Sequence, residues 1–525
     1  MSSRRYRVAL AGIAALWLAL RILFWNGYYT EDAPGYVTDA ICAATGDYHA
    51  RNHVNGLNVG TYLPVALPIA VLGKSDAALG VWPLACSLLG LLSMAGLARL
   101  FFGPVCGLLA ALLYATYPGD VFFSTVVMPD AIQAGWLTFS MFLIGVAAQP
   151  TSRRVPILVA AGTAMGMCHL VRANDIQLLP VGVLAALALP GLSGGRWREG
   201  AKDALAVLSG WTCVIAAEGI AYLWAAGDFL LRLHVVQRHY GTMDSIARAG
   251  LNIDPRTIPY SLFAPVWWWL HGGWGRLNQD QAYHGLLFTG AVLSLMAGGA
   301  IALSARRVDR RGAAGLALAA TWLLWPVLYH QFGSQSLTHF VPMHRLSRHL
   351  VVYAPGAMFA VAGGTALAIE IVGNTRAWWL KTVAVVAAGL ALLLHLRVNL
   401  QGEQMAYRAY RDIKDTYVRI EERLPADTHT VSADPGDLCF LDFRMNPLRV
   451  ERVKMIPFAA YDRCDQLREG VVITQSNPGW SGGAPVIVDT VRRLPCLTAP
   501  PRSWQLLYGG YPEKVFVIQG GHARN

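Results

Sequence analysis

Charged residues are scarce in this chain of 525 residues. Asp, Glu, Lys and Arg make up only 14% of it, whereas 54% of the residues are hydrophobic. Soluble domains carry about 25% charged residues, so this composition excludes an ordinary soluble protein and indicates a membrane protein. The net charge of +11 would suit a nucleic-acid partner, but no dense basic tract is present. The basic residues lie in short clusters between apolar runs, as membrane topology explains.

Metal, redox and hydrolase signatures are missing as well. The eight cysteines form no CxxC pair and no Cys/His zinc spacing, and no HExxH motif is present. One GxSxG match, GWSGG at 479–483, is followed only by His522, in a tail too small for a hydrolase sheet. We therefore expect no dedicated metal cage and no serine hydrolase. The chain also lacks an evident internal repeat.

Long apolar runs are abundant, each near the roughly 20 residues that a bilayer requires. They predict a polytopic α-helical membrane protein with about eleven spans, at 8–26, 77–101, 104–118, 126–147, 155–171, 175–192, 202–226, 283–304, 312–332, 350–372 and 378–398. The first is predicted to be uncleaved, because bulky residues follow it where a cleavage site would need small ones. The short, proline-interrupted stretch 61–73 is expected to be interfacial or re-entrant.

Basic clusters mark alternate connections between these runs and orient them. They are RRYR at 4–7, TSRR at 151–154, GRWREGAK at 195–202, ARRVDRR at 305–311 and GNTRAWW at 373–379. The positive-inside rule places such clusters in the cytoplasm. The opposite connections, which include the long loops 27–76 and 227–282, then face outward. The membrane domain is therefore expected to span 1–398, with a cytoplasmic N-terminus.

The tail, 399–525, has a different character. A charge-rich helical stretch at 402–423 precedes five β-like runs: THTVSAD, VERVKMI, GVVITQ, WQLLYGG and KVFVIQ. This pattern predicts a small soluble α/β domain of about 125 residues on the outer side. Cys439, Cys464 and Cys496 fall within it. Either one pair forms a disulfide in an oxidising compartment, or all three are unpaired thiols.

Acidic residues mark the outer face. Glu31 and Asp32 follow the first span in TEDAPGYVTDA, and Asp130 opens an apolar helix after Pro. Carboxylates there can take a proton from an attacking hydroxyl or amine, and Glu31 with Asp32 could hold Mg²⁺ or Mn²⁺. The alternatives are solvated loop acids and helix N-caps. We interpret Asp39 as the solvated side of a short interfacial helix, and Asp120 as a turn acid.

Cations gather on the same outer face, against the positive-inside rule, which implies an anionic ligand. The clusters comprise His49, Arg51 and His53, then His169 and Arg172, then Arg232, His234, Arg238 and His239, and finally His339, His344, Arg345, Arg348 and His349. The arginine fork matches phosphate oxygens, so we predict phosphate binding by Arg345 and Arg348. Anchoring to lipid headgroups is the alternative for each cluster.

The order of these features resembles a known family. TEDAPGYVTDA is followed by YATYPGDVFFSTVVMPDAIQAGW and AAGTAMGMCHLVRAND, and a further match comes at RLSRHLVVYAPGAMFAVAGG. Over roughly residues 8–185, and again at this last segment, the chain resembles the bacterial protein O-mannosyltransferase and aminoarabinose-transferase superfamily, which has the C-type glycosyltransferase fold. The resemblance implies transfer of a sugar from a polyprenyl-phosphate donor, on the periplasmic side of a bacterial inner membrane.

The resemblance also implies roles for individual residues. Glu31 or Asp32 would be the base, and which of the two stays open because many relatives have the order Asp-Glu. Asp130 would support the base or position the acceptor. The donor phosphate would be held by Arg345, Arg348, Arg172 and His349. Candidates near the acceptor are Arg51, Tyr62 and Trp269, although the WWW run containing Trp269 could instead anchor the loop at the interface.

The partners implied are a polyprenyl-phosphate-linked sugar, membrane lipid and an acceptor of unknown class. That acceptor could be lipopolysaccharide or lipid A, a cell-wall glycan, or a protein hydroxyl. A transporter or flippase of lipid-linked sugars is the main alternative. It would place ionisable residues deep within the spans, where Glu218 is nearly the only acid. A non-catalytic scaffold would leave the outer acids and arginines unexplained.

Overall fold

The computed structural model describes residues 1–28, 32–47, 55–172, 177–192, 197–238, 282–304, 310–332, 350–374, 378–433, 435–448, 450–467, 470–475, 494–497, 500–501, 504–508 and 513–518. It forms two compact units. The helical unit comprises Met1–Trp25, His49–Thr61 and Val81–Ala406, and the mixed unit comprises Asn26–Tyr48, Tyr62–Gly80 and Tyr407–Asn525.

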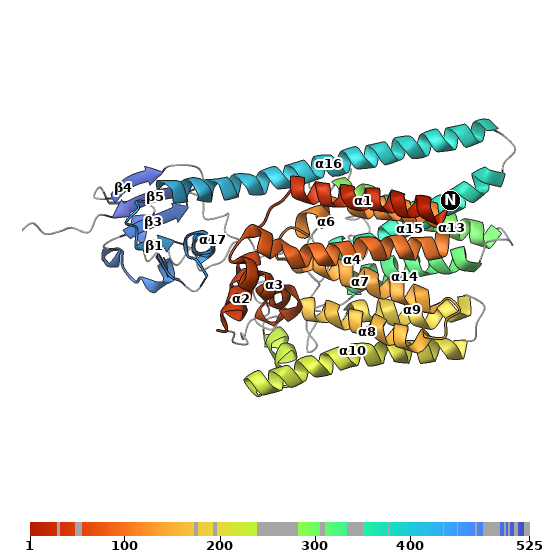
Figure 1. Ribbon diagram of the computed structural model, residues 1–525, viewed down its shortest axis with the longest axis horizontal. Coiled ribbons are helices and arrows are strands. Elements are labelled where there is room, and N and C mark those ends of the chain that lie inside the picture. The colour runs from red at the N-terminus through yellow and green to blue at the C-terminus, as the bar shows by residue number, and fades with distance from the viewer. Residues whose placement is uncertain are drawn as a thin grey trace, which may run out of the picture. The chain divides into compact units, whose positions relative to one another are not determined.

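A helix lies at every apolar run predicted to span the membrane (Figure 1). The helices are α1 (Ser3–Leu23), α4 (Asp76–Phe102), α5 (Pro104–Ala115), α7 (Pro129–Ala147), α8 (Arg154–Val171), α9 (Leu179–Leu192), α10 (Trp197–Ala226), α13 (Ala282–Ser304), α14 (Arg310–Phe332), α15 (Leu350–Asn374) and α16 (Trp378–Arg423). Among the described residues, 7 helices are long and apolar enough to cross a membrane. The polytopic helical fold is confirmed, and the larger span count stays a prediction.

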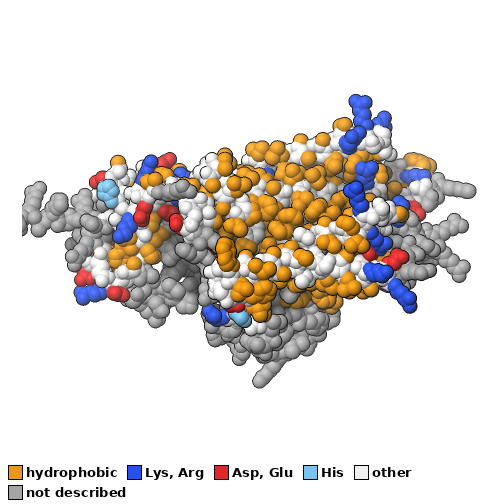
Figure 2. Space-filling model, turned by 60° about the horizontal axis from the view of Figure 1, so that its bottom comes forward, with side chains coloured by type: hydrophobic (Ala, Val, Ile, Leu, Met, Phe, Trp, Pro, Cys, Tyr) orange, Lys and Arg blue, Asp and Glu red, His pale blue; other side chains and the backbone are white. Residues whose placement is uncertain are grey.

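The helices of the helical unit pack closely because small residues stand where their backbones meet. A Cβ added at Gly162 of α8 would lie 1.9 Å from the carbonyl oxygen of Val207 in α10, and one at Gly210 would lie 2.1 Å from that of Val159. Lipid gives no hydrophobic drive for helix association, so close van der Waals contact at such positions matters more than in water. Figure 2 shows one face of the bundle covered by hydrophobic side chains. That surface suits acyl chains.

Two shorter helices belong to the segment between α1 and α4. α2 (Ala33–Thr45) confirms the short helix predicted after the acidic pair, and α3 (Val59–Leu72) runs through Pro64 and Pro68. The interpretation of Asp39 is wrong: this side chain is buried, with 4% exposure. α2 packs on α17 (Pro435–Met445), a distant part of the chain, and sequence periodicity cannot show such long-range packing.

The tail contains a mixed sheet of five described strands, each at one of the β-like runs. Its strands are β1 (Thr430–Ala433), β2 (Lys454–Pro457), β3 (Gly470–Gln475), β4 (Trp504–Tyr508) and β5 (Glu513–Ile518). They lie in the order β2-β1-β3-β5-β4. β1 pairs in parallel with β2 and β3, whereas β5 is antiparallel to β3 and β4. The helical stretch expected at 402–423 is the last part of α16, so the expected domain boundary at 398 falls inside one continuous helix.

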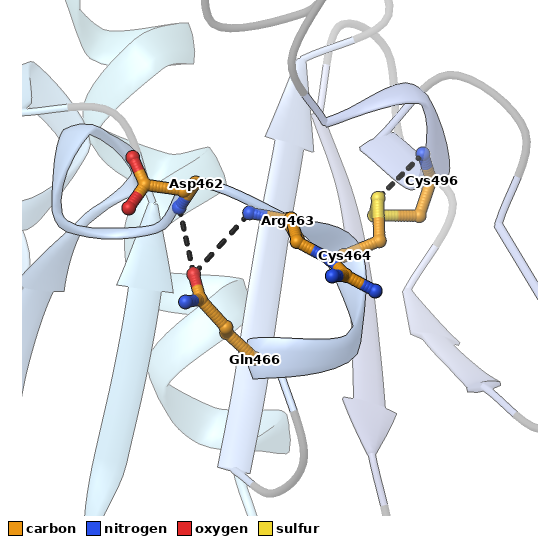
Figure 3. Close-up of a disulfide and its surroundings, with 5 residues drawn as sticks. All are labelled: Asp462, Arg463, Cys464, Gln466 and Cys496. Atoms are coloured by element: carbon orange, nitrogen blue, oxygen red, sulfur yellow. Dashed lines mark hydrogen bonds between the residues drawn. A yellow bond between two sulfur atoms is a disulfide. The ribbon is translucent and has the colours of Figure 1, made fainter.

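A disulfide joins Cys464 to Cys496 beside this sheet (Figure 3). Gln466 fixes the turn before it, because its Oε1 accepts hydrogen bonds from the backbone N–H groups of Asp462 (2.7 Å) and Arg463 (3.2 Å). The bridge packs with Phe458, Leu467, Val472, Leu494 and Leu497. The structure thus selects one of the pairings that the sequence left open. The side chain of Cys439 lies outside the described residues.

We predict that removing this disulfide destabilises the mixed unit. The bridge closes a chain separation of 32 residues, and a crosslink over such a loop contributes roughly 3 kcal/mol. Replacing Cys464 and Cys496 together by Ser should lower the unfolding temperature, as followed by thermal unfolding of the purified protein. Cys213→Ser is the matched control, because Cys213 is an exposed free thiol. Alkylation of both residues 464 and 496 in unreduced protein would contradict the assignment.

Candidate functional site

Asp130 lies in the first turn of α7, at the end of the bundle opposite the basic start of α8. Its side chain is fully buried, and Oδ1 lies 3.3 Å from Nη1 of Arg172. Oδ2 has no hydrogen-bond partner among the described residues. Met128 is the N-cap residue and no side chain caps the helix, so the alternative role of Asp130 as a cap is excluded. A half-satisfied buried carboxylate is costly and therefore a candidate functional group.

Arg172 follows the last residue of α8 in an extended conformation, and several contacts fix this turn. Thr61 Oγ1 donates to the carbonyl of Val171 at 2.8 Å. An added Cβ at Gly60 would lie only 2.8 Å from the backbone of Leu170 and Val171, so glycine is needed for this close approach. The backbone next to Arg172 is therefore held by Gly60 and Thr61 as well as by its own helix.

Gln133 was missed by sequence reasoning. It lies one turn after Asp130 on α7, and residues three apart share a helix face. The side chain is fully buried, and neither amide Oε1 nor Nε2 has a partner among the described residues. The sequence offers a weak signal for it, a glutamine in the first turns of an apolar helix after an acid. A ligand that bonds both the carboxylate and the amide would satisfy these atoms.

A second cluster holds the same loops together. Arg232 donates to Glu218 at 2.8 Å, to the carbonyl of His169 at 2.8 Å, and to the carbonyl of Leu57. Tyr222 also donates to Leu57, at 3.2 Å. Arg232 was predicted to face an anionic ligand together with the other outer cations. The structure instead pairs it with Glu218, an acid of α10, and bonds it to the backbone carbonyl of Leu57.

His234 is likewise engaged within the protein. Its Nδ1 lies 2.7 Å from Asp228 Oδ2, at an exposed position. The hydrogen bond from His234 holds the pKa of the Asp228 carboxyl below its usual value. The predicted cation clusters therefore include residues that pair with acids of the protein itself, which the sequence did not reveal.

Asp120 is not the turn acid that the sequence suggested. It lies on the short helix α6 (Pro118–Phe123), fully buried, and forms an ion pair with Arg21 of α1. Arg21 also donates to the carbonyls of Trp17 (2.9 Å) and Ala115 (3.0 Å). An isolated charge in a span is expensive, so Arg21 requires this partner. Arg21 lies inside the first predicted span, and a charged residue at such a position indicates an acidic partner elsewhere in the chain.

Asp32 belongs to the mixed unit and stands at the N-terminus of α2. Its carbonyl accepts the N–H groups of Gly35 (3.2 Å) and Tyr36 (3.4 Å), but its side chain makes no capping bond to the helix. The capping alternative for this carboxylate is therefore not observed. The side chain is partly exposed to solvent. Asp32 thus retains the access that a base needs.

The segment before Asp32 is fixed by a contact that the sequence did not reveal. Asp76 Oδ1 accepts the N–H of Tyr28 at 2.9 Å, and Asp76 Oδ2 pairs with Lys414. Lys414 Nζ also donates to the carbonyl of Asn26, at 3.1 Å. Gly27 has φ +73°, and an added Cβ there would lie 2.3 Å from the Asp76 carboxyl carbon. Only glycine fits this turn, which leads the chain towards the acidic pair.

The other predicted site residues are distributed as follows. Tyr62 is fully buried on α3, within the mixed unit. The candidates outside the described residues are Glu31, Arg51, Trp269, Arg345, Arg348 and His349, as is the rejected motif 479–483. Within the described part of the chain, no group of three or more His, Cys, Asp or Glu side chains could hold a metal ion. The cation site predicted at Glu31 and Asp32 therefore stays untested.

Comparison with solved structures shows the C-type glycosyltransferase fold. The oligosaccharyltransferase of Archaeoglobus fulgidus, in complex with zinc and sulfate, is 13% identical over 97% of this chain and 73% of its own, with a TM-score of 0.56. ArnT from Cupriavidus metallidurans, bound to undecaprenyl phosphate, is 14% identical over 99% of both chains, with a TM-score of 0.51. The archaeal oligosaccharyltransferase AglB, in complex with an inhibitory peptide and a dolichol-phosphate, is 12% identical to this chain, with a TM-score of 0.52.

No protein-family model matches the chain, and no curated protein matches it in sequence. The structural similarity therefore establishes the fold. The sequence identities are so low that comparison of sequences alone finds no relative. The resemblance that the motifs predict is confirmed at this level. Activity, substrate and site residues need arguments of their own.

We predict that Asp120→Asn lowers the free energy of unfolding by about 3 to 5 kcal/mol, because it leaves Arg21 as an uncompensated buried charge. Replacing both residues by apolar ones, Arg21→Met with Asp120→Leu, should recover much of that loss. Chemical unfolding in detergent measures both. Asp228→Asn, at an exposed pair, is the control and should leave stability unchanged. A double variant that loses the sum of both single losses would show that the pair is not coupled.

Proposed function

We propose that this protein is an integral-membrane glycosyltransferase that moves a sugar from a polyprenyl-phosphate donor to an acceptor outside the cytoplasm. The observation that carries the proposal is the shared fold with ArnT, whose structure with undecaprenyl phosphate matches over 99% of both chains. Asp130 with its unpartnered oxygen, Arg172 and Gln133 support it, because they provide buried polar groups at one end of the bundle.

The chemistry suits such a site. Glu31 or Asp32 accepts the proton of the acceptor hydroxyl or amine, whose oxygen or nitrogen attacks the anomeric carbon. The bond from that carbon to the phosphate oxygen breaks, and its electron pair leaves with the lipid phosphate. Arg345 and Arg348 stabilise the charge that develops there, and direct displacement inverts the anomeric centre.

The groups of the helical unit position the reactants. Arg172 contacts Oδ1 of Asp130, and Oδ2 of Asp130 can accept a hydrogen bond from the acceptor or from a sugar hydroxyl. Gln133 offers one acceptor and two donor hydrogens to the same ligand. Arg172 and His349 would add donors for the phosphate. Arg51, Tyr62 and Trp269 are proposed to lie near the acceptor.

The proposed location is the inner membrane of a bacterium, with 1–398 as the membrane domain and 399–525 as a periplasmic domain. The disulfide between Cys464 and Cys496 supports an oxidising compartment for that domain. The basic starts of α1 and α8, with exposed Arg4 and Arg153, support a cytoplasmic N-terminus. A lipopolysaccharide or lipid A sugar, a cell-wall glycan and a protein hydroxyl all fit the proposed chemistry as acceptor.

We predict that carboxylate substitutions abolish transfer. In membranes supplied with radiolabelled polyprenyl-phosphate sugars, Glu31→Gln combined with Asp32→Asn should lower transfer by about 100-fold or more, the usual contribution of a general base. Asp130→Asn should also lower it, and Asp228→Asn should not. Full activity of the double variant would refute the base assignment.

If the wild-type protein moves intact donor across the membrane of vesicles without cleaving it, the transporter alternative holds. EDTA in the same assay decides whether Glu31 and Asp32 need a divalent cation.

Gln133 gives a prediction that separates function from stability. Gln133→Leu replaces an amide that has no partner within the described protein by an apolar group of similar size. We expect unchanged or higher stability, because no internal hydrogen bond is lost, together with a raised KM for donor or acceptor. Thr138→Val is a matched control, since Thr138 is equally buried on α7 but bonds the carbonyl of Ala134. A Gln133 variant that loses stability and keeps its KM would contradict the ligand-binding role.

A further inference from the structure

A pocket of about 320 Å³ lies at the basic end of the helical unit. Asp130 and Arg172 lie at the opposite end of the same unit. The pocket is formed where α4 ends, α14 begins and α15 makes its last turns. Figure 2 shows Lys and Arg side chains gathered at this end of the hydrophobic bundle. The lining combines apolar groups with charged ones: Leu100, Phe102, Leu316 and Leu367, with Arg99, Arg311 and Glu370. Nothing in the proposed transfer reaction uses it.

Glycines shape this pocket. Phe102 packs so closely on α14 and α15 that an added Cβ at Gly315 or Gly363 would lie 2.6 or 2.7 Å from its ring. Gly312, in the first turn of α14, also lines the pocket, and a Cβ there would meet no atom within 4 Å. The aromatic wall is thus set by close packing, whereas the space beside Gly312 is open.

The charged groups of the lining differ in sign. Arg99 stacks on Tyr6 of α1, with the guanidinium carbon 4.4 Å from the ring centroid. Stacking uses the face of the guanidinium, so N–H donors at its edge can still bind an anion. Arg311 and Glu370 stand at exposed positions on the other two helices. Two cations and one carboxylate around one apolar pocket complement a ligand that carries a phosphate, an ammonium group and hydrocarbon.

We propose that this pocket binds a membrane phospholipid with an ethanolamine headgroup, as a site separate from any donor or acceptor site. The phosphate lies against Arg99 and Arg311, the ammonium pairs with Glu370, and the acyl chains run along the leucines. The site lies where lipid headgroups meet helix ends, and basic pockets between spans bind headgroups at this depth. Glu370 disfavours headgroups whose only charge is the phosphate, because its carboxylate then has no ammonium group to pair with.

Lipid retention measured by native mass spectrometry tests this site. The purified full-length protein is offered phosphatidylethanolamine, phosphatidylcholine and phosphatidylglycerol with identical acyl chains. We expect phosphatidylethanolamine to be retained about fivefold better than the other two, the factor that one partly exposed ion pair of about 1 kcal/mol provides. The choline headgroup lacks N–H donors for Glu370, and the glycerol headgroup lacks the cation.

Matched variants identify the pocket as the source of the effect. Glu370→Gln should abolish the preference for ethanolamine over glycerol headgroups, and Arg311→Gln should weaken binding of all three lipids. Gly312→Leu should fill the open space and reduce retention. The controls are Arg153→Gln, an exposed arginine away from the pocket, and Gly299→Leu, a helical glycine that also has open space around it. Equal retention of the three lipids by wild type, better retention of phosphatidylglycerol, or equal losses in the controls would overturn the proposal.

Discussion

The ion pair between Arg21 and Asp120 is the interaction on which the helical unit most depends. Both groups are buried in a bundle whose outer surface is apolar, so neither can be hydrated. Their desolvation is compensated by each other, by Ser87, by the carbonyls of Trp17 and Ala115, and by the Trp17 ring, whose centroid lies 4.6 Å from the guanidinium carbon of Arg21. The pair ties α1 to α4, to the end of α5 and to α6. In lipid, where apolar burial between helices contributes little, such a polar contact specifies which helices meet.

Polar contacts also hold the chain that leads to the acidic pair. α1 is the helix that precedes Glu31 and Asp32 along the chain, and its last turn is held by Arg21. Within the mixed unit, Asp76 and Lys414 then hold the backbone at Asn26 and Tyr28. A catalytic carboxylate needs a fixed backbone and an accessible side chain. Asp32 has a partly exposed side chain and a backbone carbonyl that accepts hydrogen bonds from Gly35 and Tyr36.

Local patterns predicted the elements of this fold, and long-range contacts decided the roles of single residues. Apolar runs predicted the helices, and alternation predicted all five strands, because both signals are contained in neighbouring residues. Asp120 and Asp39 were assigned to solvent because burial depends on long-range contacts, such as the one between Asp120 and Arg21, about 100 residues away. Asp130 became a candidate through its motif. Gln133 did not, because only the three-dimensional structure shows that its amide has no partner among the described residues.

The distribution of satisfied and unsatisfied polar groups favours a transferase over a transporter. Glu218, the acid that a transport mechanism would most readily use, is bonded to Arg232, which also fixes two backbone carbonyls. Arg232 thus has three partners within the protein, and such an arginine is suited to holding loops in place. A transporter that alternates between two states would instead need contacts that break and form again. Asp130 and Gln133 show the opposite pattern, buried at one end of the bundle with polar atoms unused. Their cost is explained most directly by a ligand that arrives from that side and completes their hydrogen bonds.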